Sequence, residues 1–262
     1  MSRSKRDTSQ RRDKIARMLK ENGSVQVLKL IDQFSVSGVT IRKDLQFLED
    51  QGIATRSYGG AMLSKKAVFA VESPFERKQT LNAVEKSGIS KAAAGLINDG
   101  DSIILDSGST ILQIAPHLKN KKGVTVVTNS HQVISELASF EHIEVISLGG
   151  TFRRKSQSFY GKSAEQALQK LHVDKLFLGV DGFNMERGIT THFEAEAELN
   201  RIMCSVASEV IVVTDSSKFG TICLHKILEP KQVNCIVTDS EIPQEYMDGL
   251  KRLGIENIVV ST

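Results

Sequence analysis

Apolar side chains recur every three or four positions along the first fifty residues, which is the spacing of one face of a helix. In the first stretch, for example, Ile15, Met18 and Leu19 share one side. Ser24 and Ser37 directly precede two further stretches and are predicted N-caps, because a serine hydroxyl accepts hydrogen bonds from free helix N–H groups. The pattern therefore predicts three short helices, at 11–21, 25–34 and 37–51.

The spacing changes after the third helix. The stretch 53–58 reads as an extended strand, the Gly59-Gly60 pair predicts a tight turn, and 61–63 returns as a second strand. Three helices followed by a hairpin are predicted to form a first domain over 1–63.

The rest of the chain alternates short apolar strands with amphipathic helices. Continuous β-branched runs separated by helices favour a largely parallel sheet covered on both faces, so an α/β domain is predicted over 82–262. The stretch 64–81 lacks a clear period and is predicted to be a linker, after which a capping box from Asn82 to Glu85 opens the first helix. Seven strands are predicted, at 102–107, 124–129, 143–150, 175–182, 210–216, 235–240 and 257–262. Helices are predicted at 82–98, 109–119, 130–140, 162–171, 193–208 and 243–253.

Charge is distributed unevenly over these two predicted domains. The chain of 262 residues carries a net charge of +3, but residues 1–63 hold twelve Lys and Arg against seven Asp and Glu. A small basic domain on a near-neutral body favours contact with a polyanion. The three cysteines show no metal-binding or disulfide spacing, and no membrane span or signal peptide stands out. We therefore expect a cytoplasmic protein without a metal or cofactor.

The third predicted helix has a polar face opposite its buried stripe. With Ile41 turned inward, a step of about 100° per residue places Val39, Arg42, Lys43 and Gln46 outward. Arg42 is suited to a guanine, Gln46 to an adenine and Val39 to a thymine methyl group. Lys43 is suited to a phosphate.

The start of this helix and the hairpin add further candidates. Free N–H groups at a helix start suit a phosphate oxygen, and Arg56 and Tyr58 would follow the DNA backbone or minor groove. Helix spacing alone equally fits a small helical bundle with an ordinary solvated face. The candidate DNA-binding residues are Ser37, Gly38, Val39, Thr40, Arg42, Lys43, Gln46, Arg56 and Tyr58.

The stretch VSGVTIRKDLQFLEDQGIATRSYGGA resembles the winged helix-turn-helix signature of the DeoR family of bacterial regulators. That signature runs from a Ser-x-x-Thr-Ile-Arg-x-Asp-Leu core to a Gly-Gly-Ala wing. One departure is Tyr58, where many members carry histidine. The resemblance implies that the first domain binds double-stranded operator DNA. The matching positions are Ser37, Thr40, Ile41, Arg42, Asp44, Leu45, Gly59, Gly60 and Ala61.

Three turns rich in small and hydroxyl-bearing residues follow predicted strands, at the end where open α/β sheets bind ligands. Small residues let the backbone approach an anion, and hydroxyl and N–H groups donate hydrogen bonds to it. Each turn alone is ordinary turn chemistry, but three in succession favour a phosphate site. Neither a P-loop nor a dinucleotide fingerprint occurs. The turn residues are Asp106, Ser107, Gly108, Ser109, Thr110, Thr128, Asn129, Gly149 and Gly150.

Charged residues after the later strands are candidates for the polar groups of a sugar. A carboxylate, a lysine and a basic loop that converge on a phosphate site bind hydroxyl groups or move protons. Glu196 and Glu198, on the helix predicted over 193–208, are instead expected to be solvated. The further candidates are Arg153, Asp181, Gly182, Glu194 and Lys218.

The second domain also resembles the DeoR family, in its effector domain. The resemblance implies a Rossmann-like fold akin to ribose-5-phosphate isomerase, kept for sensing a phosphorylated sugar rather than for turnover. It further implies a homo-oligomer, dimer or tetramer, that represses a carbohydrate-utilisation operon; the stretch RRKSQSFYG is most similar to the subgroup for amino sugars such as N-acetylgalactosamine. The matching pieces are SPFERK, DSGST, TN, LGG, GVDG and TDSSKF.

Two other functions remain open on the residues alone. The body could be a working sugar-phosphate isomerase with an accessory DNA-binding head. No histidine is expected beside paired carboxylates, and His192, near Glu194, is the nearest candidate for such chemistry. The chain could also be a DNA binder that senses nothing.

Overall fold

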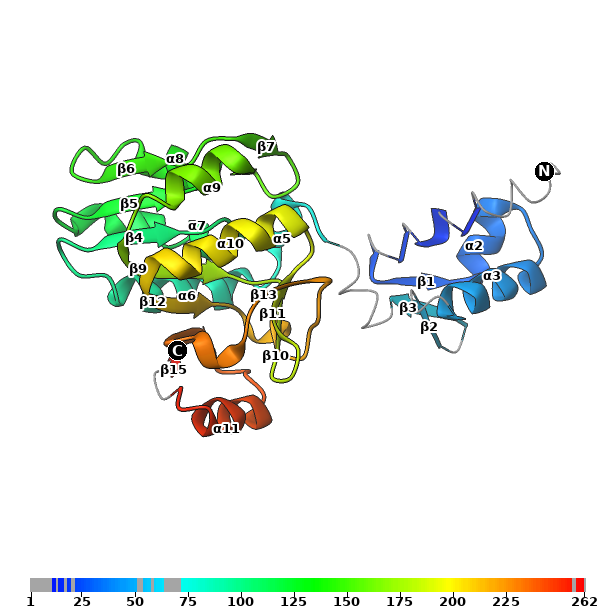
Figure 1. The fold of residues 1–262 in the computed structure, drawn as a ribbon. Helices are drawn as coiled ribbons and strands as arrows, with labels where there is room; N and C mark the ends of the chain where they lie inside the picture. The colour runs from blue at the N-terminus through cyan, green and yellow to red at the C-terminus, as the bar shows by residue number, and fades with distance from the viewer. Residues whose placement is uncertain are drawn as a thin grey trace. The chain divides into compact units, whose positions relative to one another are not determined.

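The computed structural model describes residues 11–12, 14–16, 18–19, 22–50, 54–57, 59–63, 72–255 and 258–261. The chain divides into two compact units, Met1–Val71 and Glu72–Thr262, which we call the head and the body and describe separately (Figure 1). No helix of the described part of the chain is long and apolar enough to cross a membrane.

The head contains the predicted helices and hairpin, with one added strand. The described residues of 11–22 are helical, and β1 pairs with the hairpin in an antiparallel sheet of order β1-β3-β2. The apolar stripes of the three helices meet in one core, in which Ile15, Leu30 and Ile41 are fully buried. The elements after the first helix are β1 (Ser24–Gln26), α2 (Val27–Phe34), α3 (Gly38–Asp50), β2 (Ala54–Ser57) and β3 (Gly60–Leu63).

Ser24 is not the N-cap of the second helix, so that prediction is wrong. It begins β1, and its neighbour Val25 pairs with Ala61 across the sheet. Pairing with β3 gives the backbone of this segment hydrogen-bond partners and also buries the Val25 side chain. A helix cap at Ser24 would satisfy backbone groups but would not by itself bury Val25. The approach of β1 to β3 requires glycine at Gly60, because a Cβ atom there would lie 2.2 Å from the carbonyl oxygen of Val25.

The body is built on a seven-stranded parallel sheet of order β15-β14-β12-β9-β4-β5-β6. All seven predicted strands are present. The chain starts at β4, adds β5 and β6 on one side and then returns to add β9 on the other, so the strand order reverses between β4 and β9. The strands are β4 (Ser102–Leu105), β5 (Thr125–Thr128), β6 (Glu144–Ser147), β9 (Val173–Gly179), β12 (Ala207–Val213), β14 (Cys235–Asp239) and β15 (Ile258–Ser261).

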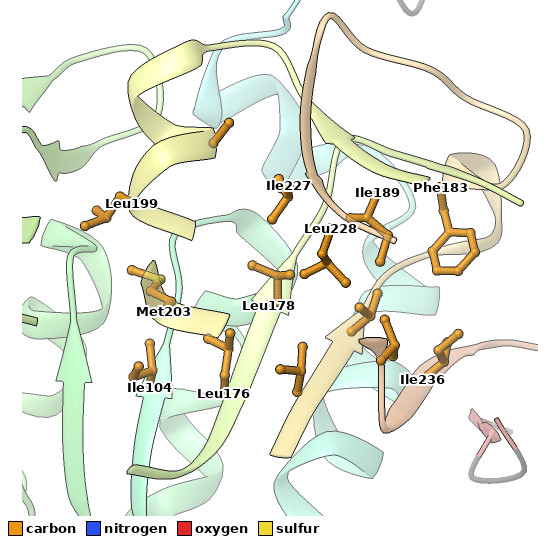
Figure 2. Close-up of a cluster of buried hydrophobic side chains, with 14 of the residues drawn as sticks. Ile104, Leu176, Leu178, Phe183, Ile189, Leu199, Met203, Ile227, Leu228 and Ile236 are labelled. Atoms are coloured by element: carbon orange, nitrogen blue, oxygen red, sulfur yellow. The ribbon is translucent and has the colours of Figure 1, made fainter. Parts of the chain in front are cut away.

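Helices cover both faces of this sheet. Alternate residues of each strand face opposite sides, and the apolar residues on each side pack against helices. In β4, Ile104 belongs to one apolar cluster, whereas Ile103 and Leu105 belong to the other. The first cluster includes residues of α9 (Lys162–Leu168), α10 (Glu194–Val206) and α11 (Gln244–Arg252), and Figure 2 shows part of it. The second includes residues of α6 (Ala83–Gly95), α7 (Ser109–Leu112), η1 (Ala115–Asn120) and α8 (His131–Leu137).

Two small antiparallel sheets in the body are absent from the sequence prediction. One pairs β7 (Thr151–Arg153) with β8 (Ser158–Tyr160). The other has the order β10-β11-β13, formed by β10 (Gly182–Asn184), β11 (Gly188–Thr191) and β13 (His225–Leu228). These strands are three or four residues long.

The start of the body differs from the prediction in two ways. The stretch predicted as linker contains a helix, α5 (Phe75–Thr80), which is anchored by the buried side chain of Phe75. The capping box at Asn82 is also absent: this residue has a left-handed backbone with φ of 52°, and its side chain makes no cap hydrogen bond. Instead it donates a hydrogen bond of 2.9 Å to Asp215, because a carboxylate after β12 is the stronger acceptor.

Candidate functional site

The third helix of the head, α3, exposes three of the predicted DNA-contacting side chains. Val39, Arg42 and Lys43 are exposed, opposite the buried stripe of the same helix. Ser37 is the predicted N-cap, and its Oγ accepts a hydrogen bond of 3.2 Å from the N–H of Thr40. Gly38 leaves room for Arg42, because a Cβ atom on Gly38 would lie 3.3 Å from the Arg42 guanidinium.

The hairpin is linked to α3 through two further candidates. Arg56 Nη1 donates a hydrogen bond of 2.5 Å to the side-chain oxygen of Gln46, and the Arg56 N–H donates one of 2.9 Å to Glu49. The Gln46 amide N–H groups donate to Glu49 and Asp50. Gln46 must therefore exchange these partners for a base before it reads DNA. Tyr58 lies outside the described residues.

A buried carboxylate fixes α3 to the first helix. Asp44 is almost fully buried and accepts hydrogen bonds from Arg11 at 2.6 Å and Arg12 at 2.7 Å. The Arg12 guanidinium also lies over the Phe47 ring, 4.0 Å from its centre. Two arginines compensate the burial of one carboxylate, so Asp44 orients α3 without being available to DNA.

In the body, Asp106 lies at the reversal of strand order, where β4 ends beside β9. Its Oδ2 accepts a hydrogen bond of 3.0 Å from Asn200 of α10, whereas its Oδ1 is buried without a partner. Burial raises the pKa of Asp106 to about 7, against the hydrogen bonds from the Ser107 and Gly179 N–H groups that lower it. Such a carboxyl group can accept from, or donate to, a polar ligand.

The turn after Asp106 leads into α7, as predicted. Gly108 has φ of 136°, a backbone conformation that L side chains rarely adopt, and a Cβ atom there would meet nothing within 4 Å. Ser109 and Thr110 are buried, and Ser107 is half-buried. The turn is thus open on the glycine side.

The next two turns hold their candidates by internal hydrogen bonds. Thr128 Oγ1 accepts from the Ser130 N–H at 3.0 Å, and Asn129 donates to the carbonyl oxygen of Phe159 at 3.2 Å. The Asn129 side-chain oxygen is buried without a partner. Gly149 faces open space, whereas a Cβ atom on Gly150 would lie 2.5 Å from the Tyr160 carbonyl oxygen. The glycine at 150 is therefore explained by the approach of β8.

Asp181, after β9, is paired with a residue that the sequence did not single out. Lys78 of α5 lies 2.8 Å from its Oδ1, and the Thr191 hydroxyl donates to its Oδ2 at 2.9 Å. Burial raises the pKa of Asp181, but the charge and hydrogen bond of Lys78 and the charges of His192 and Lys218 together outweigh burial, so the net shift is downward. Gly182 follows, where a Cβ atom would lie 2.7 Å from the Thr221 carbonyl oxygen, so this glycine has a packing role.

Arg153 and Glu196 form the second charged group of the body. Glu196 is buried and lies 3.2 Å from Arg153, so the expectation that Glu196 is a solvated charge is wrong. Glu198 is exposed as expected, and Glu194, which the sequence favoured, is exposed as well. Burial raises the pKa of Glu196. Residues two apart in a helix lie on nearly opposite sides of its axis. Glu196 is therefore on the inner side of α10, whereas Glu194 and Glu198 are on the exposed side.

Arg153 also binds the start of the body. Its two terminal nitrogens each lie 2.5 Å from an oxygen of Glu72, and Lys155 lies 3.4 Å from the same carboxylate. The Arg153 guanidinium covers the Phe193 ring at 4.4 Å from its centre. The sequence does not single out Glu72 as a partner of Arg153, because Glu72 lies in a stretch without a clear period.

His192 lies closer to carboxylates than the sequence indicated. Burial lowers its pKa, while the charges of Asp181 and Glu72 raise it, so both carboxylates lie within electrostatic reach of the ring. Its Nε2 is 3.6 Å from the sulfur of Cys223. Lys218 is half-buried, within electrostatic reach of Asp181. No set of three or more metal-ligating side chains is arranged around a common point within the described ranges.

Both units match known domains. Residues 11–67 match the DeoR-like helix-turn-helix domain, and residues 81–240 match the DeoR C terminal sensor domain. The chain belongs to the DeoR family. A similar DeoR-family relative, from Escherichia coli O157:H7, is named as an aga operon transcriptional repressor; it is 48% identical over 97% of this chain and 94% of its own length. The lactose phosphotransferase system repressor of Lactococcus lactis is 33% identical over 91% of this chain and 93% of its own length.

Among solved structures, ribose-5-phosphate isomerase A of Methanocaldococcus jannaschii is similar with a TM-score of 0.39 and 21% identity, covering 53% of this chain and 55% of that one. The two family matches, and not this distant likeness, show that the helix-turn-helix and the sensor domain of the DeoR family are both present. Three contacts explain why residues of the DeoR signature occur at their positions in the head. Ser37 caps α3, Asp44 forms ion pairs with Arg11 and Arg12, and Gly60 lets β3 approach the carbonyl oxygen of Val25.

Proposed function

We propose that this chain is a DNA-binding repressor of a carbohydrate-utilisation operon and that a phosphorylated sugar releases it from the operator. The match of both units to the DeoR family carries the proposal. The resemblance of the stretch RRKSQSFYG to the amino-sugar subgroup favours an amino-sugar operon, and we propose an amino-sugar phosphate such as galactosamine 6-phosphate as the effector.

We assign operator reading to the exposed face of α3. Arg42 can reach a guanine and Val39 a thymine methyl group, while Lys43 meets phosphate. A dimer or tetramer would present two such helices to the two half-sites of one operator, since most operator sites repeat with the symmetry of the protein.

We assign effector binding to the strand ends of the body. The sequence favours the turns that contain Asp106 and Asn129 for the phosphate. We instead assign the phosphate to two cationic groups, Arg153 and Lys155, and the hydroxyl or amino groups of the sugar to the acceptors Asp106 and Asn129. The buried oxygens of Asp106 and Asn129 have no partner in the described part of the chain, and a buried acceptor without a donor is costly. A sugar with several hydroxyl groups supplies such donors.

We propose sensing rather than turnover for this site. His192 lies near Asp181 and Glu72, yet the similar proteins of Escherichia coli and Lactococcus lactis are named repressors. Incubating the protein with pentose and hexosamine phosphates and following substrate loss by NMR tests this directly. Catalytic turnover would replace the proposal by a sugar-phosphate isomerase that carries a DNA-binding head.

Arg42→Ala tests the assignment of the reading helix. We expect the variant to lose discrimination between its operator and a scrambled duplex by about tenfold or more, because one good base contact contributes about 1–3 kcal/mol. Its affinity for galactosamine 6-phosphate stays unchanged. Lys14→Ala, an exposed charge on the first helix, is the control and keeps discrimination. Full discrimination in Arg42→Ala would show that another surface reads the bases.

A further inference from the structure

The segment from Glu72 to Asn82 connects the head to the body, and side chains that we assign to the effector site hold it in place. Glu72 is the first described residue after 63, at the start of the compact unit that forms the body. Two candidate site residues and one further carboxylate each bind a different part of the segment: Arg153 binds Glu72 at 2.5 Å, Asp181 binds Lys78 at 2.8 Å, and Asp215 binds Asn82 at 2.9 Å.

Glu72 occupies the donors that a phosphate group would use. Its two oxygens take both terminal nitrogens of Arg153, and Lys155 lies 3.4 Å from one of them. A forked guanidinium with a neighbouring ammonium group is the arrangement that recognises carboxylates and phosphates alike. The carboxylate of Glu72 is buried, with a side-chain exposed fraction of 6%.

Glu72 is charged in this position. Burial raises its pKa, but the hydrogen bonds and the charge of Arg153 lower it more, and the net shift is downward. A phosphate on Arg153 and Lys155 would therefore lie against a second anion at hydrogen-bond distance. Like charges repel in a buried site, and Glu72 already takes both terminal nitrogens of Arg153, so a phosphate must compete with Glu72 for these donors.

Glu196 shares Arg153 but cannot replace Glu72 as the occupant. Only one of its oxygens reaches the guanidinium, at 3.2 Å, and it is held on α10 rather than on a chain terminus of the body. Glu72 lies beside the residues that lead to the head. Loss of its ion pair with Arg153 thus frees the first described residue of the body.

Resting on the proposed function, we infer that Glu72 is an internal competitor for the phosphate group of the effector. Binding of that phosphate to Arg153 and Lys155 releases Glu72, and with it the segment that leads to the DNA-binding head. Linkage makes the effect reciprocal: any change that removes Glu72 from Arg153 strengthens effector binding, and effector binding loosens the segment.

Glu72→Gln tests the competition by isothermal titration calorimetry, with galactosamine 6-phosphate and with inorganic phosphate as separate probes. The glutamine keeps the shape of the side chain and removes its charge. We expect both probes to bind about tenfold more tightly than to the wild-type protein. Glu198→Gln, an exposed carboxylate paired with Arg201 on α10, makes the same change in net charge and is expected to keep the wild-type affinity.

Hydrogen exchange of the wild-type protein gives a second reading that needs no variant. Adding galactosamine 6-phosphate is expected to speed exchange in the peptide 72–82 and to slow it at the turn 106–110. If Glu72→Gln folds but binds the two probes no more tightly than the wild-type protein, the inference is wrong. If the variant fails to fold, the wild-type exchange decides: unchanged or slower exchange of peptide 72–82 on adding the sugar phosphate also overturns the inference. Wild-type protein that binds no sugar phosphate contradicts the proposed function itself.

Discussion

Asn200 donates a hydrogen bond of 3.0 Å to Asp106, which joins the middle of α10 to the end of β4. The bond uses one oxygen of a fully buried carboxyl group and leaves the other without a partner. Burial raises the pKa of Asp106 to about 7, so the group changes its charge near neutral pH. The carboxyl group at the reversal of strand order is therefore poised to respond to a ligand.

Asp106→Asn is expected to change the pH dependence of stability. Because the pKa of Asp106 is raised in the folded protein, its stabilisation is fully present below its usual pKa of 3.8 and is lost as the pH rises through about 7. The free energy of unfolding of the wild-type body, relative to the variant, should fall by on the order of 2–4 kcal/mol between about pH 4 and pH 8. Urea denaturation followed by circular dichroism measures it.

Asp248→Asn, on the exposed side of α11, is the matched control and should keep the wild-type pH profile. Parallel profiles for the wild-type protein and Asp106→Asn would show that the carboxyl group is hydrated and titrates normally.

Asp181→Asn is expected to weaken both the body and its response to the effector. The substitution leaves the partly buried Lys78 without its counter-ion, at a cost of about 1–3 kcal/mol in the free energy of unfolding. Sugar-phosphate affinity should fall by about tenfold or more if the carboxylate binds a hydroxyl group. Glu229→Gln removes a solvent-exposed pair with Lys226 and should cost less than about 1 kcal/mol. Equal stability losses in the two variants would contradict a buried role for Asp181.

Gly60→Ala is expected to disable the head and spare the body. The added methyl group would lie 2.2 Å from the Val25 carbonyl oxygen, so β1 and β3 must separate at a cost of about 1–3 kcal/mol. Operator affinity should drop, whereas calorimetric binding of galactosamine 6-phosphate stays at the wild-type value. Gly95→Ala, where the methyl group meets nothing within 4 Å, serves as the control. Undiminished operator binding by Gly60→Ala would mean that the wing can shift without consequence.

The inner strands of the parallel sheet could be predicted because each contains a run of buried residues, whereas the edge strands β6 and β15 are not buried and were found from their apolar sequence. In β12, Val210, Ile211, Val212 and Val213 are all buried by helices on both faces. The short strands β7 and β10 were missed because each has only three residues, one fewer than the shortest strand of the parallel sheet; pairing with residues distant in sequence is equally hidden from local patterns. Ser24 shows the same limit: it is a favourable helix cap by sequence, but it lies in a strand because its neighbour Val25 pairs with Ala61.

The candidate site could be predicted where residues follow strands, as at Asp106, Asn129 and Asp181. It was missed where residues reach the site from elsewhere in the chain. Glu72 and Lys78 come from the segment before the first strand, and no local pattern reveals that they meet Arg153 and Asp181. Ion pairs across such distances are set by the tertiary fold alone.

Fluorescence anisotropy with a labelled duplex from the region upstream of the chain's own gene tests the central claim most directly. We predict that the wild-type protein binds this duplex more tightly than a scrambled one and that galactosamine 6-phosphate, but not unphosphorylated galactosamine, releases it. Equal binding to both duplexes would contradict operator recognition by the head. Operator binding unaffected by a panel of sugar phosphates would contradict sensing by the body.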